Sequence, residues 1–306
     1  MDLHIFLGGK RKLAFSMIEL SIVILIISIL IAAVVTSSSV VKKSKNKVAQ
    51  SITKSSDVNS IKNLELWLET TLPESLENSN NSFDVENNDS ITNWHDINPQ
   101  RTPNLVASEA TNMPTYVEKG INDLPTLFFD GSNDSTSGDL LKIDYQQLLN
   151  SPNFTTFVVT QAIAQNGWGC IMASRHGSDF TGYNIYKKDD NSAWELWVGD
   201  SVDWEGIINS STINFNNPEI FTVTQDNSTS IFYRNGQLVG SNTISFTPNT
   251  SYAFQIGAGN SGIADDYFFN GYISEVIVFS SHLKDSQINQ VNQYLSKKYN
   301  IDVSLI

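Results

Sequence analysis

Residues 230–241 read SIFYRNGQLVGS, and this stretch indicates the class of fold. Asn235 and Gly236 stand between two short runs of apolar residues, one of them rich in aromatic side chains. A two-residue hairpin turn needs positive φ angles at both central positions, and Asn followed by Gly adopts them most readily. The stretch therefore predicts an antiparallel β-hairpin.

Similar strand signals recur on both sides of this hairpin. The predicted strands are short, rich in aromatic and β-branched residues, and bounded by Gly, Asn, Asp or Pro. They are FTTFVVTQAI at 154–163, YNIYKK at 183–188, AWELWVG at 193–199, EIFTVTQD at 219–226, YAFQIGAG at 252–259 and FFNGYISEVIVFS at 268–280. Many short strands at regular spacing predict a mainly β fold, either an antiparallel sandwich or a barrel.

Two other segments of this region carry different patterns. Asp285 can cap a short C-terminal helix that continues to Tyr299, with one apolar stripe and with Lys297 and Lys298 in the last turn. Residues 76–103 are instead rich in Asn, Ser and Asp, which predicts a loop with little burial.

The charge is unevenly distributed along the 306 residues. The whole chain has 19 basic and 32 acidic residues, a net charge of −13, which disfavours binding to nucleic acid through phosphate contacts. Residues 1–62 contain nine of the basic residues and only three of the acidic ones, so the remainder carries a net charge of −19. This asymmetry predicts a basic, membrane-proximal stem and a separate acidic domain.

The stem contains one long apolar segment. Residues 17–35 read MIELSIVILIISILIAAVV, which is long enough to span a bilayer as a helix. No small-residue cleavage site follows it, so we expect the segment to stay attached. The sequence after it can continue the helix, which predicts a long N-terminal helix over 15–55 with a transmembrane span at 17–35.

Glu19 is the one carboxylate in this apolar segment. A carboxylate in lipid costs free energy, so it either snorkels to the interface, shares a proton within a bundle or has an assembly role. Residues 10–20, KRKLAFSMIEL, resemble the processing site of type IV prepilins. The resemblance implies a leader at 1–14, cleavage between Ala14 and Phe15, methylation of Phe15, and pairing of Glu19 with a neighbouring subunit's new N-terminus. Ala14 departs from the family, which usually has glycine there.

The prepilin resemblance implies a structural function. Its partners would be other pilin-like subunits, a prepilin peptidase and the assembly machinery of a bacterial inner membrane. The chain would cross that membrane once with its N-terminus in the cytoplasm, and would later reach the periplasm or an extracellular pilus or pseudopilus, in a minor position because the domain is large. One alternative is a pilus-mounted adhesin or lectin that binds a glycan or a surface protein. Another is an unprocessed, single-span anchored periplasmic protein.

A second resemblance concerns residues 56–306. The phrases LELWL at 64–68, SITNWHD at 90–96, LFFDGSND at 127–134 and GYISEVIVF at 271–279 resemble those of concanavalin A-like, laminin G-like domains. The resemblance implies an antiparallel jelly-roll β-sandwich. Glucanases of this fold carry a Glu-x-Asp-x-x-Glu run, which this sequence lacks, so we expect no enzymatic activity.

The domain offers two sets of candidate binding residues. Clustered carboxylates suggest a weak calcium site, with turn formation as the alternative, at Asp130, Asp134, Asp265 and Asp266. No other cofactor is expected. Trp168, Trp197 and Trp204 would form a stacking platform for a sugar if they are exposed, and the alternative is burial in the core.

Overall fold

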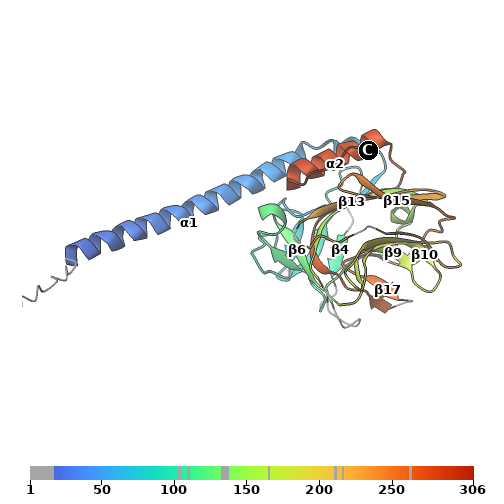
Figure 1. The fold of residues 1–306 in the computed structure, drawn as a ribbon, viewed down its shortest axis with the longest axis horizontal. Coiled ribbons are helices and arrows are strands. Elements are labelled where there is room, and N and C mark those ends of the chain that lie inside the picture. Colours follow the sequence, from blue (N-terminus) through green and yellow to red (C-terminus); the bar gives the residue numbers. More distant parts are fainter. Residues whose placement is uncertain are drawn as a thin grey trace, which may run out of the picture. The chain divides into compact units, whose positions relative to one another are not determined.

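The structure is a computed structural model that describes residues 17–101, 105–108, 111–131, 138–164, 166–209, 212–215, 217–261 and 264–306. Two large antiparallel sheets face each other, and helix α2 (Asp285–Tyr299) lies on the outside of one of them (Figure 1). The prediction of a mainly β, antiparallel sandwich with a short C-terminal helix is confirmed.

The eight-stranded sheet is built around β8 (Asn153–Ala162) and β19 (Asn270–Phe279). Its strand order is β15-β14-β13-β8-β19-β6-β5, and β1 also pairs with β19. The remaining bounds are β1 (Leu64–Glu69), β5 (Thr115–Val117), β6 (Thr126–Asp130), β13 (Glu219–Asp226), β14 (Thr229–Arg234) and β15 (Gln237–Thr243). Most residues of the central strands are buried, because the other sheet covers one face and α2 covers the other.

The nine-stranded sheet has the order β12-β11-β10-β9-β16-β7-β4-β3-β2. Its strands are β2 (Leu76–Asn78), β3 (Ile91–His95), β4 (Leu105–Ser108), β7 (Leu141–Ile143), β9 (Gly169–His176), β10 (Thr181–Lys187), β11 (Trp194–Gly199), β12 (Trp204–Asn209) and β16 (Phe254–Ile256). A small separate hairpin consists of β17 (Gly259–Ser261) and β18 (Ala264–Asp266). Short 3₁₀ helices lie at η1 (Asp57–Ser60), η2 (Ile121–Asp123) and η3 (Gln147–Asn150).

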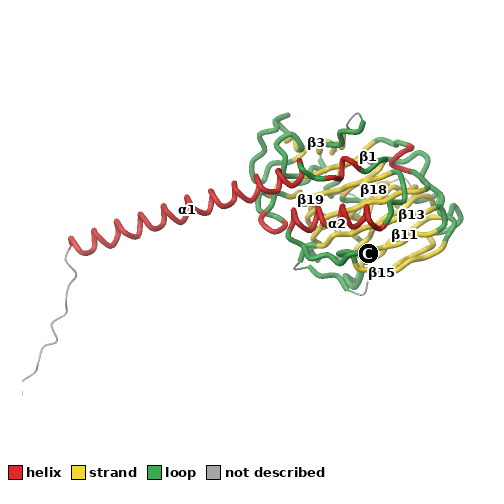
Figure 2. The backbone as a smooth tube through the Cα atoms, turned by 90° about the horizontal axis from the view of Figure 1, so that it is seen from above, coloured by secondary structure: helices red, strands yellow, loops and turns green. Residues whose placement is uncertain are grey.

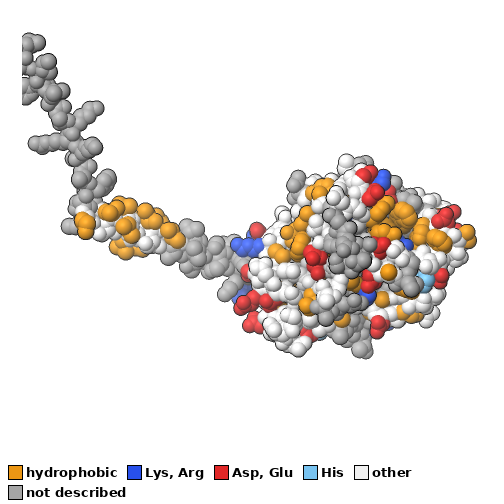
Figure 3. Space-filling view, turned by 90° about the horizontal axis from the view of Figure 1, so that it is seen from below, with side chains coloured by type: hydrophobic (Ala, Val, Ile, Leu, Met, Phe, Trp, Pro, Cys, Tyr) orange, Lys and Arg blue, Asp and Glu red, His pale blue; other side chains and the backbone are white. Residues whose placement is uncertain are grey.

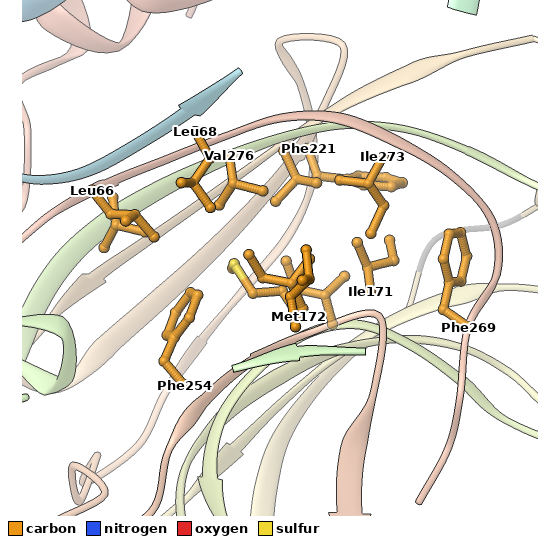
Figure 4. Close-up of a cluster of buried hydrophobic side chains, with 14 of the residues drawn as sticks. Leu66, Leu68, Ile171, Met172, Phe221, Phe254, Phe269, Ile273 and Val276 are labelled. Carbon is orange, nitrogen blue, oxygen red and sulfur yellow. The ribbon is translucent and has the colours of Figure 1, made fainter. Parts of the chain in front are cut away.

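The main hydrophobic core lies between the two sheets. Figure 4 shows Leu66 and Val276 of the eight-stranded sheet on one side, and Met172 and Phe254 of the nine-stranded sheet on the other. Each is at most 1% exposed. Burying an aliphatic or aromatic side chain of this size stabilises a fold by about 1.5–3 kcal/mol, so this interface is the main source of stability.

Helix α2 covers the outer face of the eight-stranded sheet (Figure 2). Its residues Ile288, Val291 and Leu295 are buried against Phe157 of β8 and Ile277 of β19. The predicted apolar stripe is therefore confirmed, and it accounts for the burial of sheet positions that face away from the main core.

The start of α2 differs in detail from the prediction. Lys284 is the N-cap residue, and its backbone N–H donates to the side chain of Gln287 at 3.1 Å. Asp285 is the first helical residue, where its negative charge still favours the positive end of the helix dipole.

Helix α1 (Met17–Lys54) is continuous over 38 residues. The chain divides into two compact units, 1–44 and 45–306, so the last turns of α1 belong to the same unit as the sandwich, where Ala49 packs in the cluster beneath α2. Glu19 falls within α1, whereas Ala14 and Phe15 lie outside the described residues. The predicted membrane span, 17–35, falls in α1; among the residues described, no helix combines the length and hydropathy needed to cross a bilayer.

The predicted hairpin at Asn235 and Gly236 is confirmed. These residues have φ angles of 50° and 72°, and they join β14 to β15 with Arg234 opposite Gln237.

The prediction of a loop over residues 76–103 is wrong in part. This segment contains β2 and β3, in which Leu76, Ile91 and Trp94 are buried in the main core. The Asn- and Ser-rich residues form the connection between the two strands, where the side chain of Asn78 accepts hydrogen bonds from the backbone N–H groups of Asn80 and Ser82.

A buried ion-pair network joins α2 to the eight-stranded sheet. Lys298 Nζ lies 2.7 Å from Glu69 Oε2 and 2.8 Å from Glu275 Oε2. The hydroxyl groups of Tyr294 and Tyr299 donate hydrogen bonds to Glu275, at 2.7 Å and 2.9 Å. Burying an unpaired charge costs several kcal/mol, so the lysine and both carboxylates depend on one another.

Glu69 and Lys298 keep their charges across the neutral pH range. Burial raises the pKa of Glu69, but the Lys298 ammonium and hydrogen bonds from Lys298, Thr71 and Leu72 outweigh burial and hold this pKa below its ordinary value. Burial likewise lowers the pKa of Lys298, but Glu275 and Glu69 outweigh it and raise the pKa overall. The Glu69 contribution to stability is therefore lost only as pH falls through its lowered pKa, and the Lys298 contribution only as pH rises through its raised pKa.

We predict that Lys298→Met lowers the free energy of unfolding by about 3–5 kcal/mol, because it leaves two carboxylates buried without their cation. Urea denaturation at pH 7 measures the change. Lys297→Met is the matched control, since Lys297 lies one residue earlier in the same helical turn and is exposed. It should change the free energy by no more than about 0.5 kcal/mol. Equal effects of the two substitutions would contradict the role given to the network.

Candidate functional site

The outer face of the nine-stranded sheet carries a cluster of aromatic residues. Cys170, Ala173 and Tyr186 are buried on this face, and Trp168, Trp197 and Tyr267 pack against them. Residues that neighbour them in the same strands, such as Met172 and Leu196, point instead into the main core. The outer face of this sheet is thus apolar in one place. In an antiparallel sheet with one solvated face, alternation normally places polar residues there.

A β-bulge in β9 sets which side chains reach this face. The register pairs Met172 with Ile185 but Cys170 with Tyr186, so Ile171 has no partner in β10. Both Ile171 and Met172 enter the main core, as Figure 4 shows. The extra residue changes the phase of the alternation, so that Cys170 lies on the outer face on one side of the bulge and Ala173 lies there on the other.

The β17–β18 hairpin covers part of the outer face beside β9. Gly259 comes close enough that an added Cβ would lie 3.3 Å from Cys170 Sγ and 3.3 Å from the Tyr186 hydroxyl. The backbone N–H of Cys170 donates to Tyr267 O at 2.6 Å, which fixes the segment after β18 against β9. Asn260 is fully buried and donates its side-chain amide to Arg175 O at 3.0 Å.

These elements enclose a cleft of about 320 Å³. We call it the aromatic cleft, and it is lined chiefly by Trp168, Arg175, Tyr186, Trp197, Trp204 and Tyr267. Figure 3 views the molecule from the side on which β17 lies in Figure 1, and it shows hydrophobic side chains gathered in patches with acidic side chains between them. Hydrophobic surface that forms a concave site is typical of ligand binding.

The rings of the cleft pack edge to face around Tyr186. Its ring centroid lies 5.6 Å from Trp168, 6.0 Å from Trp197 and 5.2 Å from Tyr267, with interplanar angles of 66°, 84° and 71°. Trp197 donates its indole N–H to Glu195 Oε2 at 2.8 Å, which orients the ring. Such edge-to-face packing holds the aromatic faces in fixed positions before any ligand arrives.

Arg175 is the charged residue that lines the cleft. Its guanidinium carbon lies 4.3 Å from the ring centroid of Trp204, and 5.9 Å and 5.8 Å from those of Tyr186 and Tyr267. Its side chain is hydrogen-bonded to the Tyr186 hydroxyl. Burial raises the pKa of Tyr186 well above its ordinary value, although Arg175 acts in the opposite direction, so the phenol is neutral at physiological pH.

Cys170 lies beneath the cleft and is fully buried. Burial raises the pKa of its thiol to about 12. The thiol is therefore protonated at neutral pH and is a poor nucleophile.

The structure brings together the three tryptophans that the sequence singled out. Trp168, Trp197 and Trp204 all line the cleft, and each is half-buried and not part of the main core. Sequence reasoning missed Arg175, Tyr186 and Tyr267. Tyr186 belongs to a predicted strand, but its face depends on the bulge in β9. Tyr267 follows the β17–β18 hairpin, which is not among the predicted elements although the Ser261–Gly262 pair in its sequence could have indicated a turn.

The sequence from the end of β6 to the first turns of α2 matches a known family. Residues 130–289, just over half of the 306 residues, match the sequence profile of the concanavalin A-like lectin/glucanases superfamily. The chain belongs to this superfamily. The resemblance to concanavalin A-like, laminin G-like domains is thereby confirmed. A search of curated proteins finds no match.

Solved structures with the same fold include the binding domains of several toxins. The binding domain of Paraclostridial Mosquitocidal Protein 1 aligns with a TM-score of 0.55 at 13% identity, over 77% of this chain and 52% of that one. One structure is described as showing that cell entry of botulinum neurotoxin type C depends on interaction with two ganglioside molecules. It aligns with a TM-score of 0.51 at 14% identity, over 78% of this chain and 52% of that one. The binding domain of botulinum neurotoxin DC in complex with SialylT aligns with a TM-score of 0.51 at 13% identity, over 78% of this chain and 52% of that one. This chain thus spans about half the length of these structures, and the likeness concerns the fold.

The candidate calcium residues lie in two places. Asp265 of β18 forms an ion pair with Lys142 at 2.6 Å and accepts a hydrogen bond from Gln255, while Asp266 accepts one from its neighbour's backbone. Asp130 ends β6, and Asp134 lies outside the described residues. Within the described ranges no group of three His, Cys, Asp or Glu side chains is placed to hold a metal ion.

Asp130 has a carboxylate partner that the sequence did not indicate. The backbone N–H of Asp130 donates to Asp139 Oδ2 at 3.0 Å, and the backbone N–H of Asp139 donates to Asp130 Oδ1 at 3.1 Å. Burial and the neighbouring Asp130 charge together raise the pKa of Asp139 to about 7. An acid whose pKa rises on folding makes the protein less stable as pH increases from its unfolded to its folded pKa.

We predict that Asp139→Asn removes a loss of stability that the natural protein shows between about pH 4 and pH 7, because asparagine can accept the same hydrogen bond without a charge. At pH 8 the variant should be more stable by about 1–3 kcal/mol. Thermal unfolding at pH 5 and pH 8 measures the difference.

Asp144→Asn is the control, because Asp144 is exposed and lies just after β7. It should leave the pH dependence unchanged. Millimolar calcium added at pH 8 checks the metal expectation: a rise in melting temperature in the natural protein that Asp139→Asn abolishes would support a site at Asp130. If Asp139→Asn keeps the full pH dependence of the natural protein, the assignment of that dependence to Asp139 is contradicted.

Proposed function

We propose that the sandwich is a glycan-binding module and that the aromatic cleft is its binding site. The observation that carries this proposal is the convergence of three half-buried tryptophans and two tyrosines on one cleft. An aromatic face is apolar and carries a negative quadrupole, which suits stacking against the C–H face of a sugar ring. The superfamily includes lectins, and a ganglioside is a glycan-bearing lipid that a toxin of the same fold contacts.

The size of the cleft favours a short ligand. Its volume of about 320 Å³ lies at the low end of the range of about 300–1,000 Å³ for small-molecule sites. We therefore propose that it holds one or two sugar units at a time. Binding to a surface would then gain strength from several copies of the module, because each added copy raises the effective concentration of the next.

Binding without catalysis is part of the proposal. The ionisable side chains that the structure places in the cleft wall are Arg175, Tyr186 and Tyr267. Glycoside hydrolysis uses a pair of carboxyl groups across the scissile bond. The arrangement therefore supports recognition better than bond cleavage.

We predict that Trp168→Ala weakens glycan binding at least tenfold, equivalent to about 1.4 kcal/mol, because truncating an aromatic anchor removes its stacking surface. A glycan array selects the ligand, and isothermal titration calorimetry then measures the affinity. Trp168 precedes β9, so its loss should cost the fold less than that of a strand residue.

Phe83→Ala is the matched control. Phe83 is an exposed aromatic residue between β2 and β3, at the edge of the same sheet opposite to β12. The variant should bind as the natural protein does. Unchanged binding by Trp168→Ala, or an equal loss in both variants, would sink the assignment of the cleft.

A pilin-like stem is a second candidate function, compatible with the first. It is supported by the prepilin-like sequence of residues 10–20 and by the continuous helix α1. On this proposal the chain is a minor subunit of a bacterial inner-membrane assembly and displays the sandwich. Its partners are other pilin-like subunits. The sandwich would be exposed to the periplasm or to the outside of the cell.

We predict that the mature chain, isolated from its native membrane, begins at methylated Phe15. Intact-mass and N-terminal peptide analysis, with and without the host's prepilin peptidase, measures this. A chain that still begins at Met1 in the presence of the peptidase would contradict pilin-like processing. It would leave the glycan-binding proposal untouched, because the cleft lies wholly within residues 168–267.

A further inference from the structure

Arg175 is a buried cation. Only 5% of it is exposed, although its guanidinium lines the aromatic cleft. Its position follows from the alternation of β9 beyond the bulge, where Ala173 lies on the outer face and Arg175 comes two residues later. Asn260 holds the backbone carbonyl of Arg175 at 3.0 Å, so the strand is fixed where the side chain enters the cleft.

The described arginines differ in how their charge is matched. Arg101 is paired with Glu65 and Arg234 with Glu219, whose side chains are buried. Among the residues that the structure describes, no carboxylate forms an ion pair with Arg175, and its Nε has no hydrogen-bond partner. The guanidinium of Arg175 instead donates a hydrogen bond to the neutral hydroxyl of Tyr186.

Two described carboxylates lie beside the walls of the cleft. Glu195 accepts the indole N–H of Trp197, and the charge of Asp266 acts, together with that of Arg175, on the pKa of Tyr186 and of Tyr267. One oxygen of Asp266 is occupied by the backbone N–H of Tyr267 at 2.8 Å. Asp266 therefore offsets part of the positive charge near the cleft, but within the described residues it forms no ion pair with Arg175.

The aromatic rings stabilise Arg175 only in part. The Trp204 ring, with its centroid 4.3 Å from the guanidinium carbon, attracts the cation through its negative face. Burying a cation without an anion costs more free energy than such a contact returns. A box of aromatic rings would also suit a quaternary ammonium ligand, but Arg175 already places a positive charge inside it. The charge that the site lacks is negative.

We propose that the glycan bound in the aromatic cleft is an acidic sugar, such as a sialic or uronic acid, whose carboxylate pairs with Arg175. This inference rests on the glycan-binding function proposed above. Arginine presents a planar fork of N–H donors that matches a carboxylate bidentately, and the unpartnered Nε lies on that fork. The tryptophans stack against the ring of the sugar, while Arg175 pairs with its carboxylate.

The experiment uses ligands that differ only in the acid group. The probes are 3′-sialyllactose and trigalacturonic acid, each beside its own methyl ester, titrated into the full chain by isothermal titration calorimetry. The natural protein should bind at least one acid tenfold or more tightly than the ester of that acid. The two pairs of probes distinguish a sialic acid from a uronic acid as the source of the carboxylate. Because this comparison uses the unaltered protein, it does not depend on whether a variant folds.

Arg175→Gln supplies the second arm. It should bind acid and ester with affinities within twofold of each other, while Arg175→Lys, which keeps the charge but loses the fork, should retain part of the preference. Near-ultraviolet circular dichroism and the melting temperature establish that each variant is folded. Acid and ester bound equally by the natural protein, with binding still lost in Trp168→Ala, would overturn the acidic-sugar inference and keep the glycan-binding function.

A glycan array completes the test. Hits confined to neutral glycans would likewise overturn the inference alone, and hits enriched in carboxylated glycans that Arg175→Gln loses would support it. An array on which no glycan binds would overturn both proposals.

Discussion

The strands of the nine-stranded sheet supply side chains both to the main core and to the cluster on the outer face. In β9 the bulge at Ile171 determines which residues point to each face. Strict alternation would send every second residue of the strand outward, and would expose either Ile171 or Met172. With one unpaired residue, both side chains enter the core. The same change of phase directs Cys170, Ala173 and Arg175 to the other face, where Tyr186 and the tryptophans meet them. Core packing and the shape of the cleft are therefore consequences of one local irregularity.

The eight-stranded sheet has a different function in the architecture. Its central strands are covered on both faces, by the other sheet and by α2, so it offers little free surface for a ligand. Lys298 fixes the helix in place by matching Glu69 and Glu275 in a site without solvent. A shift of α2 across the sheet would separate Lys298 from Glu69 and Glu275 and leave buried charges unpaired, which costs several kcal/mol. The outer face of the nine-stranded sheet is left as the place where binding can be built.

Local sequence signals predict the parts of this fold whose environment is local. The Asn235–Gly236 turn, the strand 154–163 and the apolar stripe of α2 each follow from a period or a turn type that a few residues carry. Strands β2 and β3 could not be predicted in the same way, because the sequence around them is rich in Asn and resembles a loop. Their burial depends instead on pairing with β4 and on packing in the same core as β1.

The candidate site shows the same limit. Tryptophans are rare enough to draw attention in a sequence, and Trp168, Trp197 and Trp204 do converge. Arg175 carries no such signal, because one arginine in a strand is ordinarily a solvated residue. Its role depends on its surroundings: a bulge that sets its direction, a hairpin that holds its backbone carbonyl, and the lack of an ion pair with any described carboxylate.

The charge of the whole chain sharpens the significance of that one arginine. With a net charge of −13, the protein repels anions, but salt screens this repulsion beyond about one Debye length, roughly 8 Å at physiological ionic strength. An acidic glycan would therefore gain nothing from long-range attraction, in contrast to ligands of basic proteins. Within the cleft the balance reverses, because a buried guanidinium is screened far less than a surface charge. On the proposed function, the cleft would accept an anion only when its ring fits the tryptophans and its carboxylate reaches Arg175. Specificity then comes from requiring both contacts at once, which is what a surface-recognition module needs from a small cleft.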